Sequence, residues 1–244
     1  HIEWCIIPRG FEPVPVQFEF DRNRMFDILG DEIYRGDPYV FVRELLQNAI
    51  DAIRMRSEIL ERKDLTLKPR IAIQVTESED GYMVEVSDNG IGMDEYIIKN
   101  YLSVAGKSYY RSCDFEREGL KMDPISRFGI GILSCFMVAD RIDICTCKDS
   151  YTTTKPEQFK ISIPAKENYF KISRPAERLE IGTTFKVFVH KSKLPKEEKT
   201  GKTIDFDVTE YLKRTAGFVK YPIYITDRGV ETTIYDPDTQ PLPG

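Results

Sequence analysis

One long helix with a polar face constrains the fold of this chain more than any other feature. Residues 38 to about 63 have helical periodicity, with Asp37 expected as the N-cap and a proline in the first turn. Glu44, Asn48 and Asp51 recur at i, i+4 and i+7, so they share one side of that helix. Burying two carboxylates and an amide without partners is costly. We therefore expect a polar structure or a ligand opposite this face.

A glycine turn supplies a candidate for what lies opposite. An apolar strand from Tyr82 to Val86 leads into Asp88, which is followed by Gly90, Gly92 and Met93. Glycines at such a point allow a ligand to approach the backbone closely. The sequence therefore predicts a binding site between this turn and the polar face of the helix.

Two further glycine signals lie later in the chain. Gly129 and Gly131 precede an apolar segment, where the exposed N–H groups at a helix start would form an anion site. Gly182 precedes Thr183 and another strand. Neither the dinucleotide-binding nor the Walker A spacing is met, so each signal is weak alone.

The order of elements predicts an α+β, two-layer sandwich, in which a mixed, mostly antiparallel sheet carries helices on one face. Further helices are expected at 22–34, 128–138 and 208–219, a glycine-broken helical pattern at 94–110, and a long loop at 111–125. Residues 191–203 are expected to be a solvated loop rather than a phosphate-binding patch. Strands are expected at 18–20, 71–75, 82–87, 141–147, 159–163, 170–174, 183–190 and 221–226. The predicted organisation is an extension or linker at 1–17, a domain at 18–226 with a lid at about 94–127, and a C-terminal linker at 227–244.

Composition excludes several classes of protein. The 244 residues carry a net charge of −5, which favours neither a nucleic-acid nor a membrane partner, and no apolar run is long enough to span a bilayer. Five cysteines without repeated intervals argue against a disulfide framework, so reduced cysteines and a cytoplasmic location are expected. Too few histidines are present for a zinc site at suitable spacing.

Taken together, the acidic-Asn-Asp helix, the Asp-x-Gly-x-Gly turn, the Gly-x-Gly segment and the Gly-Thr before a late strand resemble the gyrase, heat-shock chaperone, histidine kinase and MutL ATPase superfamily. Residues 102–108, 126–139 and 218–223 are similar to the ninety-kilodalton heat-shock chaperone family in particular. The resemblance covers about 18–225 and implies the Bergerat ATP-binding fold. Gly106 and Ile132 depart from the family pattern, which indicates a divergent member.

The resemblance implies a role for each site residue. Glu44 would be the general base for the attacking water, and Asn48 would bind Mg²⁺ through its side-chain oxygen. Asp88 would accept a hydrogen bond from the adenine amino group, which selects adenine over guanine. Each has a plain alternative: a solvated helix acid, a buried amide and a turn-forming aspartate, respectively.

The remaining implied contacts surround these three residues. Gly90 and Gly92 would clear room for the base, and Met93 would pack on it or simply fill the core. Asp51 would support the site without performing chemistry. The other implied nucleotide contacts are Ala52, Asn100 (ribose or phosphate), Lys107 and Ser108 (phosphate or ribose), the backbone of Gly129, Ile130, Gly131 and Ile132 (phosphates), and Thr183 (adenine, unless it is a surface threonine). Tyr109 and Tyr110 are expected to serve only in packing.

The expected function is that of a Mg²⁺-dependent ATPase domain of chaperone type. ATP would close the lid and promote homodimer contacts, with client or partner proteins as further ligands. In this family an arginine from a following domain completes the phosphate site, so residues 1–244 alone are expected to bind ATP and hydrolyse it weakly. The alternative is a nucleotide-gated module that switches a neighbouring domain without hydrolysis. A histidine kinase catalytic domain fits the segments at 128–139 and 221–223 poorly.

Overall fold

A single eight-stranded sheet organises the molecule, and the computed structural model describes its residues 36–104, 106–126, 129, 131–149, 156–165, 169–177, 179–196, 201–216 and 219–236. The strand order is β5-β4-β3-β6-β2-β1-β7-β8. Every neighbouring pair is antiparallel except β1 and β7. The predicted mixed, mostly antiparallel sheet is thus confirmed. The strands are β1 (Ile71–Glu77), β2 (Gly81–Asp88), β3 (Arg141–Cys147), β4 (Gln158–Pro164), β5 (Lys171–Ser173), β6 (Gly182–His190), β7 (Ile223–Asp227) and β8 (Val230–Tyr235).

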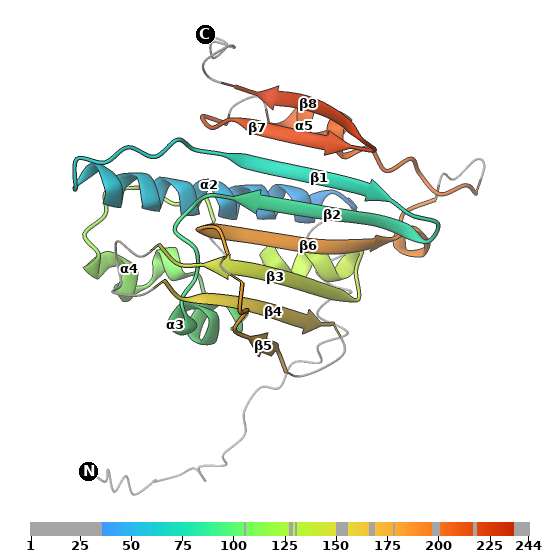
Figure 1. Ribbon diagram of the computed structural model, residues 1–244. Helices are drawn as coiled ribbons and strands as arrows, with labels where there is room; N and C mark the ends of the chain where they lie inside the picture. Colours follow the sequence, from blue (N-terminus) through green and yellow to red (C-terminus); the bar gives the residue numbers. More distant parts are fainter. Residues whose placement is uncertain are drawn as a thin grey trace, which may run out of the picture.

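The helices cover one face of this sheet, as Figure 1 shows for the long helix α2 (Val40–Glu61) and for α5 (Val208–Thr215). The apolar side of α2 is buried through Phe41, Leu45, Ala49 and Ile53, which belong to one core cluster with the inward-facing residues of the sheet. On the strands, alternate residues enter the same core, as the burial of Ile142 and Ile144 on β3 shows. The two-layer arrangement therefore follows from one apolar helix stripe meeting one apolar sheet face.

The long helix starts two residues later than predicted. Tyr39 occupies the cap position and Val40 is the first helical residue, whereas Asp37 accepts a hydrogen bond from the Tyr39 N–H at 2.9 Å. Asp37 thus binds the backbone just before the helix rather than within its first turn. No helix in the described part of the chain is long and apolar enough to cross a membrane.

Several other elements differ from the sequence-based expectation. The segment at 128–138 forms a 3₁₀-helix (Gly131–Met137), and the expected loop at 111–125 contains the short helix α4 (Cys113–Arg117). The pattern at 94–110 splits into α3 (Glu95–Ile97), a π-helical turn (Ile98–Leu102) and a 3₁₀ turn (Tyr109–Arg111). The elements expected at 18–20 and 22–34 lie outside the described residues.

The C-terminal boundary also needs correction. Residues 227–244 were expected to be a linker, but Val230–Tyr235 forms β8, which pairs with β7 and buries Tyr235. Its burial is confined to one end of the strand, so the sequence lacks the alternation that marks an inner strand. The sheet therefore extends past residue 226.

Candidate nucleotide-binding site

A pocket of about 490 Å³ opens between α2, the turn after β2, the start of β6 and the segment leading to the 3₁₀-helix. It collects side chains that lie far apart in the sequence. Of the predicted site residues, those on its wall are Glu44, Asn48, Ala52, Asp88, Gly92, Met93, Lys107, Ser108, Gly129, Gly131, Ile132 and Thr183. The pocket thus lies on the polar side of α2, where the sequence predicted a ligand.

The turn after β2 can approach α2 closely because Gly90 has no side chain. A Cβ on Gly90 would lie 2.5 Å from the Cβ of Ala52, and the next residue, Ile91, donates its N–H to the Ala52 carbonyl at 3.0 Å. Gly92 has φ +72°, and a Cβ there would lie 2.1 Å from the Cys147 carbonyl oxygen. Both glycines hold the turn against its neighbours, and only Gly92 itself reaches the pocket wall.

Asp88 is the acidic group of the pocket wall at the turn after β2. Its Oδ1 accepts the Gly90 N–H at 2.7 Å. Burial raises the pKa of Asp88 to about 7, although hydrogen bonds from the Gly90 and Thr183 backbones and the charge of Arg56 oppose that rise. A half-enclosed carboxylate with a raised pKa can accept a hydrogen bond from a ligand and lose little solvation by doing so.

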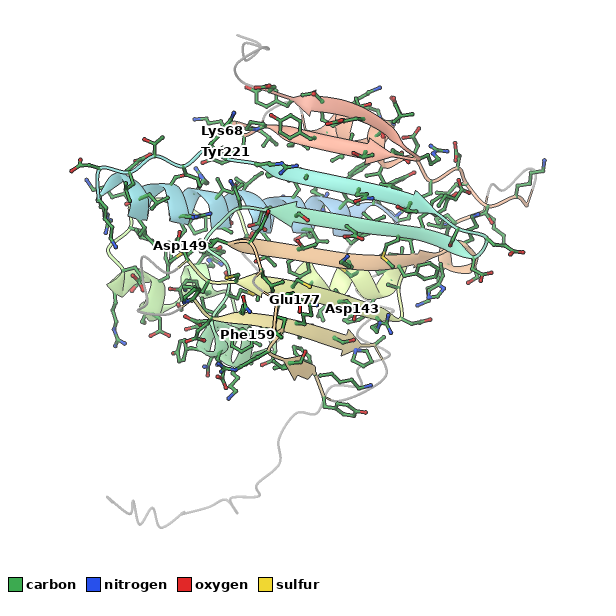
Figure 2. The ribbon with its side chains drawn as sticks, in the orientation of Figure 1. Lys68, Asp143, Asp149, Phe159, Glu177 and Tyr221 are labelled. Atoms are coloured by element: carbon green, nitrogen blue, oxygen red, sulfur yellow. The ribbon has the colours of Figure 1, made fainter. Side chains whose placement is uncertain are left out.

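A buried ion pair that the sequence did not signal lies behind Asp88. Arg56 Nε donates to Asp149 Oδ2 at 2.6 Å, and Arg56 Nη1 donates to the Asn89 carbonyl at 2.7 Å. Asp149 lies just past the end of β3, at the end of the sheet where β6 begins (Figure 2). Arg56 therefore ties α2, the turn and the end of β3 into one rigid wall.

Thr146 is a second residue that sequence reasoning missed. Its Oγ1 accepts the Met93 N–H at 2.9 Å and lies 3.1 Å from Thr183 Oγ1. Thr146 is buried on β3, in line with Ile142 and Ile144, and a threonine at an inward position of an apolar strand was the available signal. It fixes Met93 and Thr183 on the same side of the pocket.

Glu44 lies at the opposite end of the pocket, where the glycine segment meets α2. A Cβ on Gly131 would lie 2.6 Å from Glu44 Oε2, so the backbone of Gly131 packs directly on that carboxylate. Gly129 is linked to the base of the lid, because its carbonyl accepts the Gly106 N–H at 3.1 Å. Ile130 lies outside the described residues. Any group bound by this backbone would be within reach of Glu44.

Asn48 and Asp51 face the same short segment. Asn48 Oδ1 accepts a hydrogen bond from Ser126 Oγ at 2.8 Å. Asp51 is fully buried and accepts the N–H groups of Ile125 and Ser126 at 2.9 Å and 2.7 Å. Burial raises the pKa of Asp51, and these hydrogen bonds lower it. Asp51 does not line the pocket.

These contacts continue along α2 as a polar stripe that holds residues 118–126, which we call the strap. The stripe consists of Asp51, Arg54, Glu58 and Arg62, which follow each other at intervals of three or four and so share one face of the helix. In each case a side chain of α2, or of Arg62 directly after it, binds a backbone group of the strap. The pairs are Arg62 with the carbonyls of Glu118 (3.1 Å) and Gly119 (2.5 Å), Glu58 with the Lys121 N–H (2.8 Å), Arg54 with the Asp123 carbonyl (2.7 Å), and Asp51 with Ile125 and Ser126.

Some expectations about the lid are wrong. Asn100 is exposed and donates to the Tyr96 carbonyl at 2.9 Å, so it does not reach the pocket. Tyr109 and Tyr110 were expected only to pack, yet both line the pocket as well as packing near Met55, Ile91 and Phe115. Asn100 was expected only from the resemblance, and it lies in the π-helical turn at Ile98–Leu102.

The donor set fits a divalent cation that arrives with a ligand. Among the described residues no group of three His, Cys, Asp or Glu side chains could hold a metal by itself. Asn48 nevertheless offers a neutral oxygen at the pocket wall, and Mg²⁺ commonly binds through one or two protein oxygens plus phosphate oxygens and water. The site is therefore suited to a metal–phosphate complex rather than to a resident ion.

Comparison with known proteins agrees with this geometry. Residues 38–191 match the family described as histidine kinase-, DNA gyrase B- and HSP90-like ATPase, and this span includes both ends of the pocket. The chain belongs to this family.

Similar proteins include chaperone protein HtpG from Borreliella burgdorferi, 30% identical over 219 residues, and HtpG from Mesorhizobium japonicum, 30% identical over 218 residues. HtpG from Oceanobacillus iheyensis is 29% identical over 212 residues. The matches cover 86%, 86% and 85% of this chain, and 32%, 33% and 32% of the relatives. The chain thus spans about a third of the length of these relatives.

Proposed function

We propose that this chain is the Mg²⁺-dependent ATP-binding and hydrolysing domain of a heat-shock-type chaperone. The observation that carries the proposal is the pocket itself, which has Asp88 at one end, and Glu44 with Asn48, Gly129 and Gly131 at the other. An adenine nucleotide is the ligand class that needs a hydrogen-bond acceptor at its base and backbone donors at its phosphates. The similarity to HtpG chaperones supports the chaperone context.

Each residue in this arrangement has a chemical task. The carboxylate of Asp88 accepts a hydrogen bond from the adenine amino group, while Met93, held by Thr146, lies against the ring. Backbone N–H groups around Gly131 bind the phosphates. Glu44 accepts a proton from the attacking water, and the nearby glycine backbone keeps that water close to the terminal phosphate. Mg²⁺, held through Asn48, supplies charge neutralisation on the phosphate oxygens.

The same proposal includes motion and assembly. Nucleotide binding closes the lid at 94–127, the closed lids promote dimer contacts between N-terminal domains, and hydrolysis resets them. Client proteins are the further partners, in the cytoplasm. The supporting observation is that lid residues Lys107, Ser108, Tyr109, Tyr110 and Ser126 line the pocket, so a bound ligand touches the lid directly.

A switch that works without hydrolysis remains the second candidate. The contact between Ser126 and Asn48 favours it. A ligand that changes this contact would alter the strap by binding alone, without hydrolysis. Glu44→Ala in the full-length protein separates the two functions. We expect ATP binding to persist, phosphate release to fall about 10²- to 10⁴-fold, and chaperone activity to be lost. Retained chaperone activity in this variant would favour the switch.

A further inference from the structure

The oxygen atoms of Asn48 and Ser126 form a close pair on the pocket wall. Ser126 Oγ lies 2.8 Å from Asn48 Oδ1, and both residues line the pocket. Neither oxygen carries a charge. The pair joins two parts of the chain that are 78 residues apart, one on α2 and one at the end of the strap.

Ser126 is held rigidly in this position. Its N–H donates to Asp51 Oδ2 at 2.7 Å, and its carbonyl accepts the Ser108 hydroxyl at 3.3 Å. The preceding N–H, from Ile125, donates to the same buried carboxylate of Asp51. The hydroxyl of Ser126 is thus presented to Asn48 by a backbone whose N–H groups bind Asp51 of α2 and whose carbonyl binds Ser108. This arrangement is preorganised rather than a chance surface contact.

The separation of the two oxygens suits one metal ion. Mg²⁺ binds six oxygens at about 2.0–2.1 Å in octahedral geometry, so adjacent ligand oxygens lie about 2.9 Å apart. A serine or threonine hydroxyl is a known Mg²⁺ ligand next to nucleotide phosphates in other folds. A hydroxyl can also rotate its hydrogen, so Ser126 can offer a lone pair in place of the proton it now gives to Asn48.

We propose that Ser126 is a second protein ligand of the divalent cation that enters with ATP, beside Asn48. This inference rests on the proposed function and adds one residue to its metal site. It also gives the strap a role, because the stripe of α2 that ends in Asp51 sets the position of a metal ligand. The phosphate oxygens and water complete the coordination.

The test compares ATP affinity with and without Mg²⁺ in serine variants, by isothermal titration calorimetry. Ser126→Ala should weaken binding about tenfold or more in Mg²⁺ and leave it unchanged in EDTA, whereas Ser126→Thr, which keeps the hydroxyl, should stay close to wild type. Ser126→Cys should bind weakly with Mg²⁺ and recover with Cd²⁺, because thiolates prefer softer cations. Ser78→Ala and Ser78→Cys are matched controls, since Ser78 bonds Gly81 at the far hairpin.

Three results would overturn the proposal. Unchanged or tighter ATP binding by Ser126→Ala in Mg²⁺ would mean that the hydroxyl only hydrogen-bonds Asn48 and does not bind the cation. Equal weakening with and without Mg²⁺ would mean a purely structural role. Failure of Cd²⁺ to rescue Ser126→Cys beyond the Ser78→Cys control would contradict ligation, and this readout stands even if Ser126→Ala does not fold. Failure of the wild type to bind ATP in either condition would instead refute the proposed function.

Discussion

Asp88 is the residue at which stability and function oppose each other. Its ordinary pKa of 3.8 rises to about 7 in the fold because burial disfavours the charge. The free energy of unfolding therefore falls as pH rises from about 4 to about 7, because Asp88 loses its proton in the unfolded chain but keeps it in the folded one. ATP binding needs the ionised form as an acceptor. The ionised form that binds ATP is thus the form that destabilises the fold.

This conflict predicts opposite effects of Asp88→Asn on stability and binding. The amide keeps an acceptor for the Gly90 N–H but removes the buried charge. We expect a higher thermal midpoint than wild type at pH 8 and no gain at pH 5, measured by scanning calorimetry. Wild-type affinity for ATP should fall about tenfold per pH unit well below pH 7 and level off above it. A flat wild-type profile would contradict the assigned pKa.

Gly131 controls the position of the proposed base. A Cβ there would lie 2.6 Å from Glu44 Oε2, and the flexible end of the glutamate would move aside. Gly131→Ala should therefore reduce single-turnover phosphate release about 10²-fold with little change in ATP affinity. The double variant with Glu44→Ala should be no slower than Glu44→Ala alone. Additive losses would show that Gly131 acts through another group.

The strap and α2 behave as one element. Asp51 supplies both acceptors for the last two N–H groups of the strap, and its side chain is fully buried. Asp51→Ala leaves these donors without their partner, at about 1–3 kcal/mol for each that stays buried. We expect that loss in urea unfolding, with faster proteolysis near Lys121.

Glu61→Ala, exposed on the same helix, is the control for this variant. Equal proteolysis rates in Asp51→Ala and Glu61→Ala would mean that the strap is held by its other contacts alone.

Local patterns predicted the elements whose signals lie within a short window. The 3.6-residue period of α2, the alternation of β1 and β2, and the glycines after Asp88 each specify structure locally. Thr146, Arg56 and Ser126 were missed because their importance arises from partners 53, 93 and 78 residues away. Asn100 was expected from the resemblance alone, and no local pattern indicated that it would lie exposed in a π-helical turn.

For the molecule as a whole, β8 extends the sheet past residue 226. It covers β7 and buries Tyr235 at 4% exposure, and α5 contacts both strands. A chain ending at residue 226 should lose at least about 2 kcal/mol of unfolding free energy relative to one ending at residue 236, since a large aromatic side chain and one strand ladder are removed. Equal stability of the two truncations in urea would mean that β8 does not stabilise the domain, and would support the domain boundary at 226 that the sequence predicted.

The central claim is that an adenine nucleotide binds in the pocket through Asp88. Isothermal titration of the chain with ATP and Mg²⁺, for wild type and Asp88→Asn side by side, tests it most directly. We expect saturable one-site binding by the wild type and at least about a hundredfold weaker binding by the variant, which remains folded. Equal affinity of the two proteins, or no binding by the wild type, would contradict the account.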